Sequence, residues 1–595
     1  MRSYQAIINR ILAARGVEDS AEFFSDRPRE THDPFLLPDM AAGAELVFRH
    51  ISEGKKICVY GDYDVDGLMS VTLLSGFLEA LPVQDAGATQ DSSLGGPPPH
   101  DSGKITRNNI SWYIPSRFDE GFGLNIAALK QIRDTGADLV ITVDCGISSP
   151  VEIAAAKDMG MEILVTDHHE PDGDSPIGCP AIDPKRADSR YPFSGLCGCG
   201  VAFKLAQAIK NRYYPNDPAV KSAVTDSLDL VAVATIADVM PLRGENRTLV
   251  KYGMNALNAG KRWQLRALAE GIELKMGSVS AYNIAFGVAP HLNAAGRMGD
   301  PSLAVELFKT DDRARADEII KELISRNKER RREQDEAVSA CEQIIDAEYA
   351  NDGFLLVRPP YVHEGVSGIV AGRIKEKYGR PSAVLAEACG ESTGGAEDCG
   401  DSTESTGGAA LKGSARSVAG IDIISMLRSH GELFTKLGGH AMAAGFTFPA
   451  AHEDALRKAL CADVKALADK NPELLSPPPS ADADIESGEA TLELAAALEK
   501  FEPTGAGNHK PTLCLRGQVP AGIRRMGQDG KHMRFTAGGL PCVMFANAGS
   551  PAELDGGDSP EGIRQGFDLY GTLEINRWNG RESVQFIVRE AVVRK

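Results

Sequence analysis

Three aspartates at alternate positions, Asp62, Asp64 and Asp66, stand between two apolar stretches in the sequence CVYGDYDVDGLMS at 58–70. The residues before them read as a short buried strand, and those after them have apolar side chains at helical spacing with no proline until Pro82. The aspartates therefore fall on a strand-to-helix turn, which in an open α/β sheet lies at the edge where ligands bind. Carboxylates crowded there repel one another unless a divalent cation, which prefers oxygen ligands, neutralises them. Taken alone, the motif fits a metal site and an acidic turn in which Asp66 caps the helix equally well.

Further groups able to bind a metal follow apolar runs later in the chain: Asp144 in ITVDCG, Asp167, His168 and His169 in VTDHHEP, and Asp238 in TIADVMPL. We expect each run to be a strand of one parallel sheet, which brings the loops after them to the same edge. Carboxylates with one or two imidazoles and no thiolate suit Mn²⁺ or Mg²⁺ better than a structural zinc. A bridging aspartate could hold two ions and activate a water for in-line attack on phosphorus.

Each of these residues also has a plainer interpretation. Asp144 could cap a turn, and His169 could be a hydrogen-bonded core residue. Four such strand ends in one sheet are hard to attribute to chance, so the sequence favours the metal site.

The order of these motifs, DxD, VDCG, DHH and a late strand-end aspartate, resembles the DHH phosphoesterase superfamily. Within it, the chain is similar to the single-strand-specific 5′→3′ DNA exonucleases over nearly its whole length. The stretches that carry this likeness beyond the metal motifs are HDPFLLPDM (32–40), YIPSRFDEGFGLN (113–125), APHLNAAGRMGDP (289–301), HEGVSGIVAGRIKEKYGRPSAVL (363–385), KGSARS (412–417), LGGHAMAAGF (437–446) and EINRWNGRESVQF (574–586). The resemblance implies a hydrolase that cuts phosphodiester bonds by two-metal activation of water, acting in DNA repair and recombination.

The resemblance also assigns roles to single residues. It implies a metal centre, also catalytic, of Asp62, Asp64, Asp144, His168 and Asp238, with His169 as a further catalytic residue, Asp167 beside it and Asp66 in the same motif. It implies substrate binding by Arg117, Asn293, Arg297, Ser414, Arg416 and His440. Arginine offers a two-pronged donor to phosphate, and the small residues of KGSARS let backbone N–H groups approach an anion. The alternatives are surface ion pairs for Arg117 and Arg297, and a buried structural role for His440.

Three departures from the family pattern leave every expected metal ligand in place. CGCG stands at 197–200 where the family usually has a glycine-rich helix start, and Val362 precedes His363 where tryptophan is common. Two segments rich in Gly, Ser and Asp, at 84–104 and 389–408, read as surface insertions.

The resemblance and the element pattern together predict an α/β fold with several domains. We expect an N-terminal helical segment (1–50), a mainly parallel-sheet DHH catalytic domain (51–310), a long connector helix (311–350), a second α/β domain of the DHHA1 type (351–470), a linker (471–490) and an oligonucleotide-binding (OB-like) β-barrel (491–595). In the barrel, charge and one stacking surface come from Arg524, Arg525, Lys531, Arg534, Arg577, Trp578 and Arg581. Scattered arginines on a barrel are more often a solvated face.

Composition bounds the compartment and the partners. The 595 residues carry a formal net charge of −19, which argues against nonspecific coating of nucleic acid but leaves room for a basic channel. No stretch of about 18 apolar residues predicts a membrane span, and the N-terminus lacks the apolar segment of a secretion signal. Eleven cysteines without paired zinc-ligand spacing fit reduced thiols in the cytoplasm.

The expected partners are single-stranded DNA, a helicase and a single-strand-binding protein, without a membrane. One alternative function is a phosphodiesterase for cyclic dinucleotides or short oligonucleotides, or a pyrophosphatase. Another is a repair scaffold without catalysis. The connector helix and barrel favour a polymeric substrate, and the complete ligand set favours catalysis.

Overall fold

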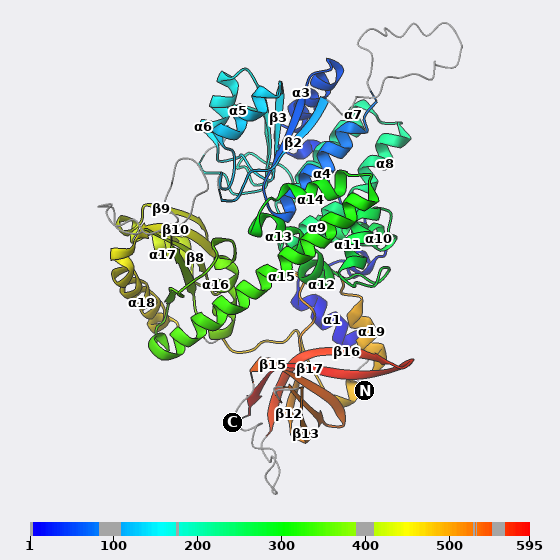
Figure 1. Cartoon of the computed structure of the whole chain (residues 1–595). Helices are drawn as coiled ribbons and strands as arrows, with labels where there is room; N and C mark the ends of the chain where they lie inside the picture. Colours follow the sequence, from blue (N-terminus) through cyan, green and yellow to red (C-terminus); the bar gives the residue numbers. More distant parts are fainter. Residues whose placement is uncertain are drawn as a thin grey trace. The chain divides into compact units, whose positions relative to one another are not determined.

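The computed structural model describes residues 4–82, 109–118, 120–173, 178–387, 410–475, 477–527, 530, 532–549 and 566–594 (Figure 1). The predicted insertions at 84–104 and 389–408, and Lys531, lie outside the described residues. The chain forms two compact units. The first unit comprises residues 1–296, 300–323 and 479–595, and the second comprises 297–299 and 324–478.

A five-stranded parallel sheet of order β2-β1-β3-β4-β5 forms the centre of the first unit. Its strands are β1 (Ile57–Gly61), β2 (Ile110–Tyr113), β3 (Leu139–Val143), β4 (Glu162–Thr166) and β5 (Ala181–Ile182). Helices α5 (Ile126–Asp134) and α6 (Pro150–Asp158) cover one face, while α3 (Met40–Ser52), α4 (Val65–Glu79) and α7 (Gly198–Tyr213) lie on the other (Figure 1). Cover on both faces explains why β1 and β3 are apolar and buried throughout rather than alternating. The predicted parallel sheet is confirmed.

One predicted strand of this domain is wrong. The apolar run before Asp238 forms a helix, α9 (Leu228–Ala237), and Asp238 is its C-terminal cap. The run is buried nearly throughout, so its apolar residues show no periodicity that separates a helix from a strand. Its length of 10 residues and its three alanines favour the helix.

The chain contains further helices before the predicted connector. They are α8 (Pro218–Asp226), α10 (Gly244–Asn258), α11 (Trp263–Gly271), α12 (Ala281–Asn283), the π-helix η3 (Ile284–Val288), α13 (Ala289–Met298) and α14 (Ser302–Lys309), preceded in the chain by α2 (Ser20–Phe24) and the 3₁₀ turn η1 (Pro34–Leu36). The predicted connector is confirmed as α15 (Arg313–Ile344), which continues as the π-helical turn η4 (Ile345–Tyr349).

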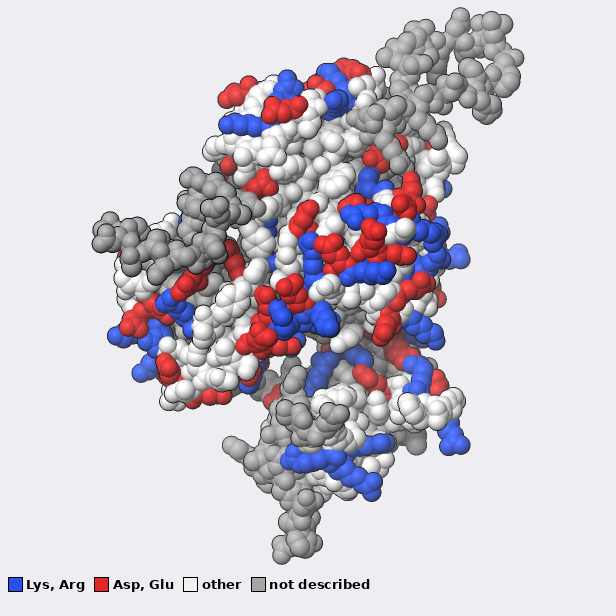
Figure 2. Space-filling model, in the orientation of Figure 1, with Lys and Arg blue, Asp and Glu red and all other residues white. Residues whose placement is uncertain are grey.

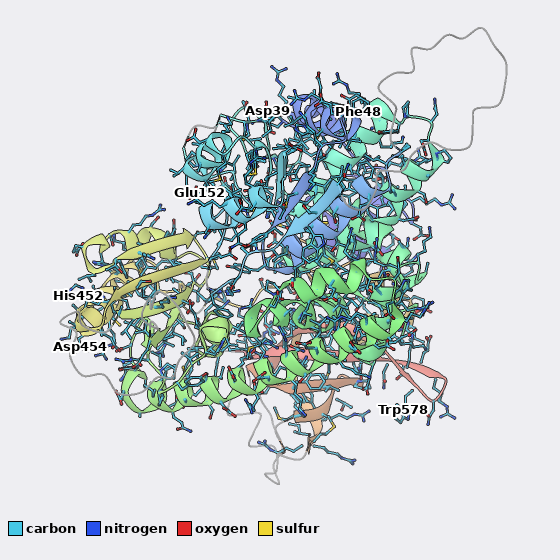
Figure 3. The ribbon with its side chains drawn as sticks, turned by 45° about the horizontal axis from the view of Figure 1, so that its top comes forward. Asp39, Phe48, Glu152, His452, Asp454 and Trp578 are labelled. Atoms are coloured by element: carbon cyan, nitrogen blue, oxygen red, sulfur yellow. The ribbon has the colours of Figure 1, made fainter. Side chains whose placement is uncertain are left out.

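The second unit contains a mixed sheet of order β6-β7-β8-β10-β9. Its strands are β6 (Leu355–Val357), β7 (Ser382–Glu387), β8 (Ala410–Arg416), β9 (Lys436–His440) and β10 (Ala443–Pro449). Its helices are α16 (Glu364–Tyr378), α17 (Ile423–Arg428) and α18 (Glu453–Lys470), with 3₁₀ turns η5 (Gly431–Leu433) and η6 (Ala450–His452). His452 and Asp454 stand at the start of α18 (Figure 3).

The C-terminal part of the first unit is a seven-stranded sheet of order β11-β12-β16-β17-β15-β14-β13. Its strands are β11 (Ala483–Ile485), β12 (Leu513–Gln518), β13 (Pro520–Met526), β14 (His532–Ala537), β15 (Leu540–Gly549), β16 (Phe567–Trp578) and β17 (Arg581–Val593). Two helices, α19 (Leu492–Glu499) and the N-terminal α1 (Tyr4–Ala14), share its core. Asn579 and Gly580, both at positive φ, form the tight turn between β16 and β17 and leave Trp578 73% exposed at the end of the hairpin (Figure 3).

The surface mixes both charges. On the face drawn in Figure 2, Lys and Arg side chains are interspersed with Asp and Glu over the helices, and several basic side chains lie over the C-terminal sheet. Among the helices that the structure describes, none has the length and apolar character that a bilayer crossing requires.

Candidate metal centre

Four neighbouring strands of the parallel sheet are each followed by an aspartate. Gly61, Val143, Thr166 and Ile182 pair in one row across β1, β3, β4 and β5, and the residues that follow them are Asp62, Asp144, Asp167 and Asp183. The backbone register therefore places a line of carboxylates along the carboxyl edge of the sheet. The sequence had identified three of these four positions.

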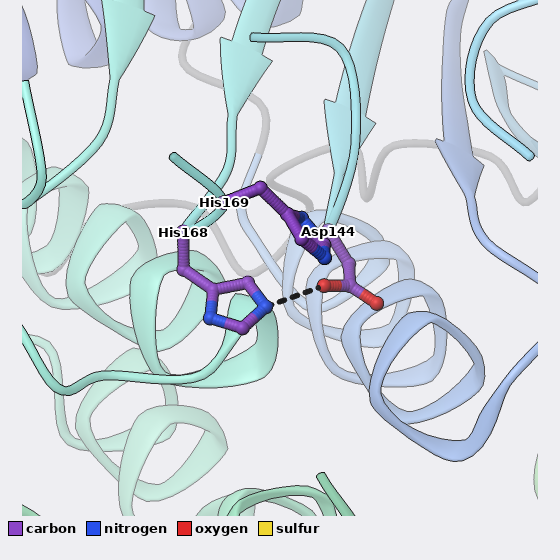
Figure 4. A group of neighbouring side chains, drawn as sticks. All are labelled: Asp144, His168 and His169. Atoms are coloured by element: carbon purple, nitrogen blue, oxygen red, sulfur yellow. Dashed lines mark ion pairs between the residues drawn. The ribbon is translucent and has the colours of Figure 1, made fainter. Parts of the chain in front are cut away.

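His168 lies at the centre of the cluster. Its Nε2 atom is 3.1 Å from Asp144 Oδ1 (Figure 4), 3.6 Å from Asp238 Oδ2 and 3.7 Å from Asp66 Oδ2. Asp238 thus reaches the edge of the sheet from the end of a helix, although the sequence had placed it after a strand. The structure brings the predicted metal-binding residues of the first unit together.

Asp66 belongs to this cluster rather than to a helix cap. Its two carboxylate oxygens accept hydrogen bonds from the backbone N–H groups of Gly198 (2.6 Å) and Cys199 (2.8 Å), at the start of α7. A side chain at Gly198 would collide with Asp144, because an added Cβ would lie 2.5 Å from the Asp144 Cβ. The cap of α4 is Asp64, whose Oδ1 accepts from the N–H groups of Asp66 and Gly67. The alternative in which Asp66 caps the helix is therefore wrong.

The donor atoms fit a divalent cation. Three groups have one ligand atom each within 4.8 Å of one another: Asp62, Asp64 and Asp144; Asp66, His168 and Asp238; and Asp144, His168 and His169. Asp62 Oδ1, Asp144 Oδ1 and both ring nitrogens of His168 are buried without a hydrogen-bond partner among the described residues. Carboxylate and imidazole donors that lack hydrogen-bonding partners are the ligands that Mn²⁺ and Mg²⁺ take.

The buried carboxylates of the cluster repel one another, and a bound cation would relieve this repulsion. Burial, with the neighbouring carboxylates adding to it, raises the pKa of Asp144 well above its usual range. The same causes, burial first, raise the pKa of Asp66 to about 6 and that of Asp238 to about 8. Burial lowers the pKa of His168 to about 3, so its imidazole is neutral and has a lone pair available for a metal.

His169 has the opposite protonation state. Burial works against its charged form, but the hydrogen bond between its Nδ1 and Asp167 Oδ1 (2.8 Å) and the nearby carboxylates raise its pKa to about 9. Its side chain is 30% exposed and the ring of Phe122 lies edge-on to it at 5.4 Å, so it is not a core residue. Asp167 is itself fixed by the backbone N–H groups of His168, His169 and Ile147.

Two of the predicted substrate-binding residues lie beside the DxD turn. The guanidinium of Arg117 lies over the ring of Tyr63 at 4.9 Å. Asn293, on α13, accepts a hydrogen bond from Val65 N through its Oδ1 (3.2 Å), at the first residue of α4. Both residues therefore border the carboxylate cluster.

The other predicted substrate-binding residues belong to the second unit, where three of them gather near the start of α16. Arg297 donates to the carbonyl of Gly365 (2.9 Å), and Ser414 Oγ lies 2.9 Å from Ser367 Oγ. The Arg416 guanidinium packs against Gly368, where an added Cβ would lie 2.6 Å from one of its nitrogens. His440 ends β9 and is exposed, so the alternative of a buried structural histidine is wrong.

Two residues of the site escaped sequence reasoning. Asp183 is fully buried, and its Oδ2 has no partner in the described part of the chain. The strand before it has only two residues, too short for the apolar-run signal that identified the others. Phe122 lies within a glycine-flanked loop, and nothing in its sequence pattern indicates contact with His169.

Comparison with known proteins agrees with this geometry. The model of the DHH family N-terminal domain matches residues 56–235, the DHHA1 domain matches 351–466, and the RecJ OB domain matches 481–590. The fold and the site are thus those of a DHH-family protein with a DHHA1 domain and an OB domain, as the sequence predicted.

Relatives that match almost the whole chain identify its family more closely. The single-stranded-DNA-specific exonuclease RecJ of Escherichia coli is 31% identical over 98% of this chain and 95% of its own length, and that of Bacillus subtilis is 30% identical over 99% and 68%. The crystal structure of RecJ from Thermus thermophilus in complex with Mn²⁺ matches with a TM-score of 0.75 and 28% identity, over 99% of this chain and 76% of that one. A second Thermus structure contains Mg²⁺ (TM-score 0.68, 26% identity, covering 99% and 75%). The chain belongs to the RecJ family of single-stranded-DNA-specific exonucleases.

Proposed function

We propose that this protein hydrolyses the phosphodiester bonds of single-stranded DNA from the 5′ end, with Mn²⁺ or Mg²⁺ as cofactor. The observation that carries the proposal is the cluster of buried, unpartnered carboxylate and imidazole atoms around His168 in a member of the RecJ family. Asp62, Asp64, Asp144, His168 and Asp238 would hold two ions, with Asp66 beside them. When bound, such ions supply a water of lowered pKa and positive charge next to the scissile phosphate.

The chain's own residues bind and orient the DNA. Arg117 and Asn293 border the DxD turn, where a phosphate would lie against the metal centre. Asp167 fixes the orientation of the His169 ring, and its hydrogen bond helps to raise the pKa of His169 to about 9 in the metal-free protein. The exposed side of that ring can donate a hydrogen bond to a phosphate oxygen or a proton to the leaving oxygen.

Other parts of the chain would extend the DNA-binding surface. Residues 51–310 would cut, the second unit would grip phosphates through Arg297, Ser414, Arg416 and His440, and residues 491–595 would guide the strand. Exposed Trp578 at the tip of the β16–β17 hairpin offers a ring on which a base can stack. A helicase and a single-strand-binding protein would deliver the substrate, in the cytoplasm.

Digestion of end-labelled DNA tests the proposal. With Mn²⁺ present, a 5′-labelled single strand should release labelled mononucleotide at once, whereas a 3′-labelled strand of the same sequence should shorten progressively. A blunt duplex should resist digestion. Release from the 3′ end, or preference for a cyclic dinucleotide over the polymer, would contradict the proposal, and absence of any cleavage would favour a scaffold.

A further inference from the structure

Three consecutive polar residues at the start of α10 are buried. Glu245, Asn246 and Arg247 have exposures of 0%, 1% and 5%. A buried polar or charged side chain destabilises the fold unless hydrogen bonds compensate. Each of these three side chains bonds to a different part of the first unit, and two of them bond to the segments that surround the metal centre.

Asn246 joins two loops that carry groups of the metal centre. Its Nδ2 donates to the carbonyl of Gly195 (2.5 Å) and to the carbonyl of Pro241 (3.2 Å). Gly195 precedes by three residues the Gly198 N–H group that holds Asp66, and Pro241 follows Asp238 by three residues. A single amide thus links the loop that orients Asp66 to the loop that carries Asp238.

The Asn246 side chain is used as a donor and not as an acceptor. Asn246 Oδ1 is buried without a partner among the described residues, a cost that an apolar side chain at this position would avoid. The two N–H donors are therefore what the site requires. Both acceptors are main-chain carbonyls, and the Asn246 amide supplies a donor to each.

Glu245 fixes the same segment from its other end. Its carboxylate contacts Lys204 Nζ (2.5 Å), a residue of α7, and accepts hydrogen bonds from the Tyr191 hydroxyl and from His32 N (3.1 Å). Tyr191 lies four residues before Gly195. The segment between these anchors therefore enters α7 at a fixed place, where its first N–H groups meet Asp66.

We propose that Asn246 is a positioning residue of the metal centre, whose amide sets the placement of Asp66 and Asp238 around His168 and thereby the affinity for Mn²⁺. The inference rests on the proposed function only in taking the cluster to be a metal site. Residues of this kind, which orient the groups around a metal without touching it, typically change metal affinity by about 10- to 100-fold when they are replaced.

The test is a titration of metal-free protein with Mn²⁺, followed by electron paramagnetic resonance of the free ion. Asn246→Asp keeps the shape of the side chain but replaces its NH₂ group by an oxygen, which repels the two carbonyls. The Mn²⁺ dissociation constant of this variant should rise by about 10-fold or more. Asn246→Ser keeps one donor at most and should give a smaller rise, so it serves if the Asp variant does not fold. Nuclease activity of either variant should recover at high Mn²⁺.

Asn258→Asp is the matched control. Asn258 ends the same helix and makes two main-chain bonds with Val279, through its Nδ2 (2.9 Å) and its Oδ1 (2.8 Å), but neither partner belongs to the metal centre. This variant should lose thermal stability and keep its Mn²⁺ affinity. A folded Asn246→Asp or Asn246→Ser protein with wild-type Mn²⁺ affinity would overturn the inference, whereas a wild-type protein that binds no Mn²⁺ would instead overturn the proposed function.

Discussion

Replacing Asp144 by asparagine should change stability and activity in opposite directions. The carboxylate is buried beside Asp66, Asp62 and Asp238, and its pKa is raised well above the usual range, first by burial and then by these neighbours. A raised carboxyl pKa means that the folded protein resists ionisation, so the ionised group destabilises the metal-free fold. Asparagine keeps the shape and removes the charge.

The neighbouring Asp66 shows how a raised carboxyl pKa affects stability. Its pKa rises from 3.8 to about 6, and at about 1.4 kcal/mol per pKa unit its ionisation costs the fold roughly 3 kcal/mol. Burial raises the pKa of Asp144 in the same direction, so Asp144→Asn should stabilise the metal-free protein at pH 8. Hydrolysis should fall at least about 100-fold, because a metal centre contributes several kcal/mol at the transition state.

The assay combines thermal unfolding with nuclease kinetics. Unfolding is followed by circular dichroism in EDTA and again in Mn²⁺, and cleavage is measured on a labelled single strand. The variant should melt higher than wild type in EDTA and gain less than wild type from Mn²⁺. A lower melting temperature in EDTA, or retention of more than about a tenth of the wild-type rate, would refute the reasoning.

Three further expectations concern pH and charge. The folded pKa values of Asp66 (about 6) and Asp238 (about 8) lie above the usual value of 3.8. Their contribution to the stability of the metal-free protein is therefore full below about pH 4 and is lost as pH rises through 6 and 8. Unfolding measured in EDTA over a pH series tests this, and Mn²⁺ should abolish the loss. In Asp167→Asn the pKa of His169 should fall below about 9, which NMR titration of the imidazole measures; an unchanged value would exclude Asp167 as the cause. Arg416→Ala should weaken single-strand binding and reduce the slope of log affinity against log salt concentration by about 1, because fewer counterions are released. Fluorescence anisotropy over a salt series measures both quantities. An unchanged slope would argue against a phosphate contact.

The sequence was most informative where local pattern and chemistry coincide. Apolar runs followed by Asp62, Asp144 and Asp167 identify both the strands and their carboxyl edge, because a parallel sheet buries the run and places the next residue at that edge. The same signal misread the run before Asp238, since a helix buried on all sides has no polar face. The proximity of Asp238 to His168 does not depend on the error, because the helix ends at the same place.

Contacts between residues far apart in the chain leave no local pattern in the sequence. Asp183 follows a two-residue strand, and its place in the row is set by pairing with β4. The bonds of Asn246 to Gly195 and Pro241 link residues up to 51 positions apart, so no spacing in the sequence reveals them. The preference of Asp66 for the N–H groups of α7 over its own helix likewise depends on how α4 packs against α7.

Anomalous diffraction from crystals grown with Mn²⁺ and a short single-stranded oligonucleotide would locate the metal ions and the DNA end together. We expect manganese peaks at the carboxyl edge of the parallel sheet, within about 2.0–2.4 Å of oxygens of Asp62, Asp64, Asp144 or Asp238 and of a ring nitrogen of His168, with the 5′ end of the DNA beside them. Manganese bound elsewhere, or an edge that stays free of metal while DNA is bound, would contradict this expectation.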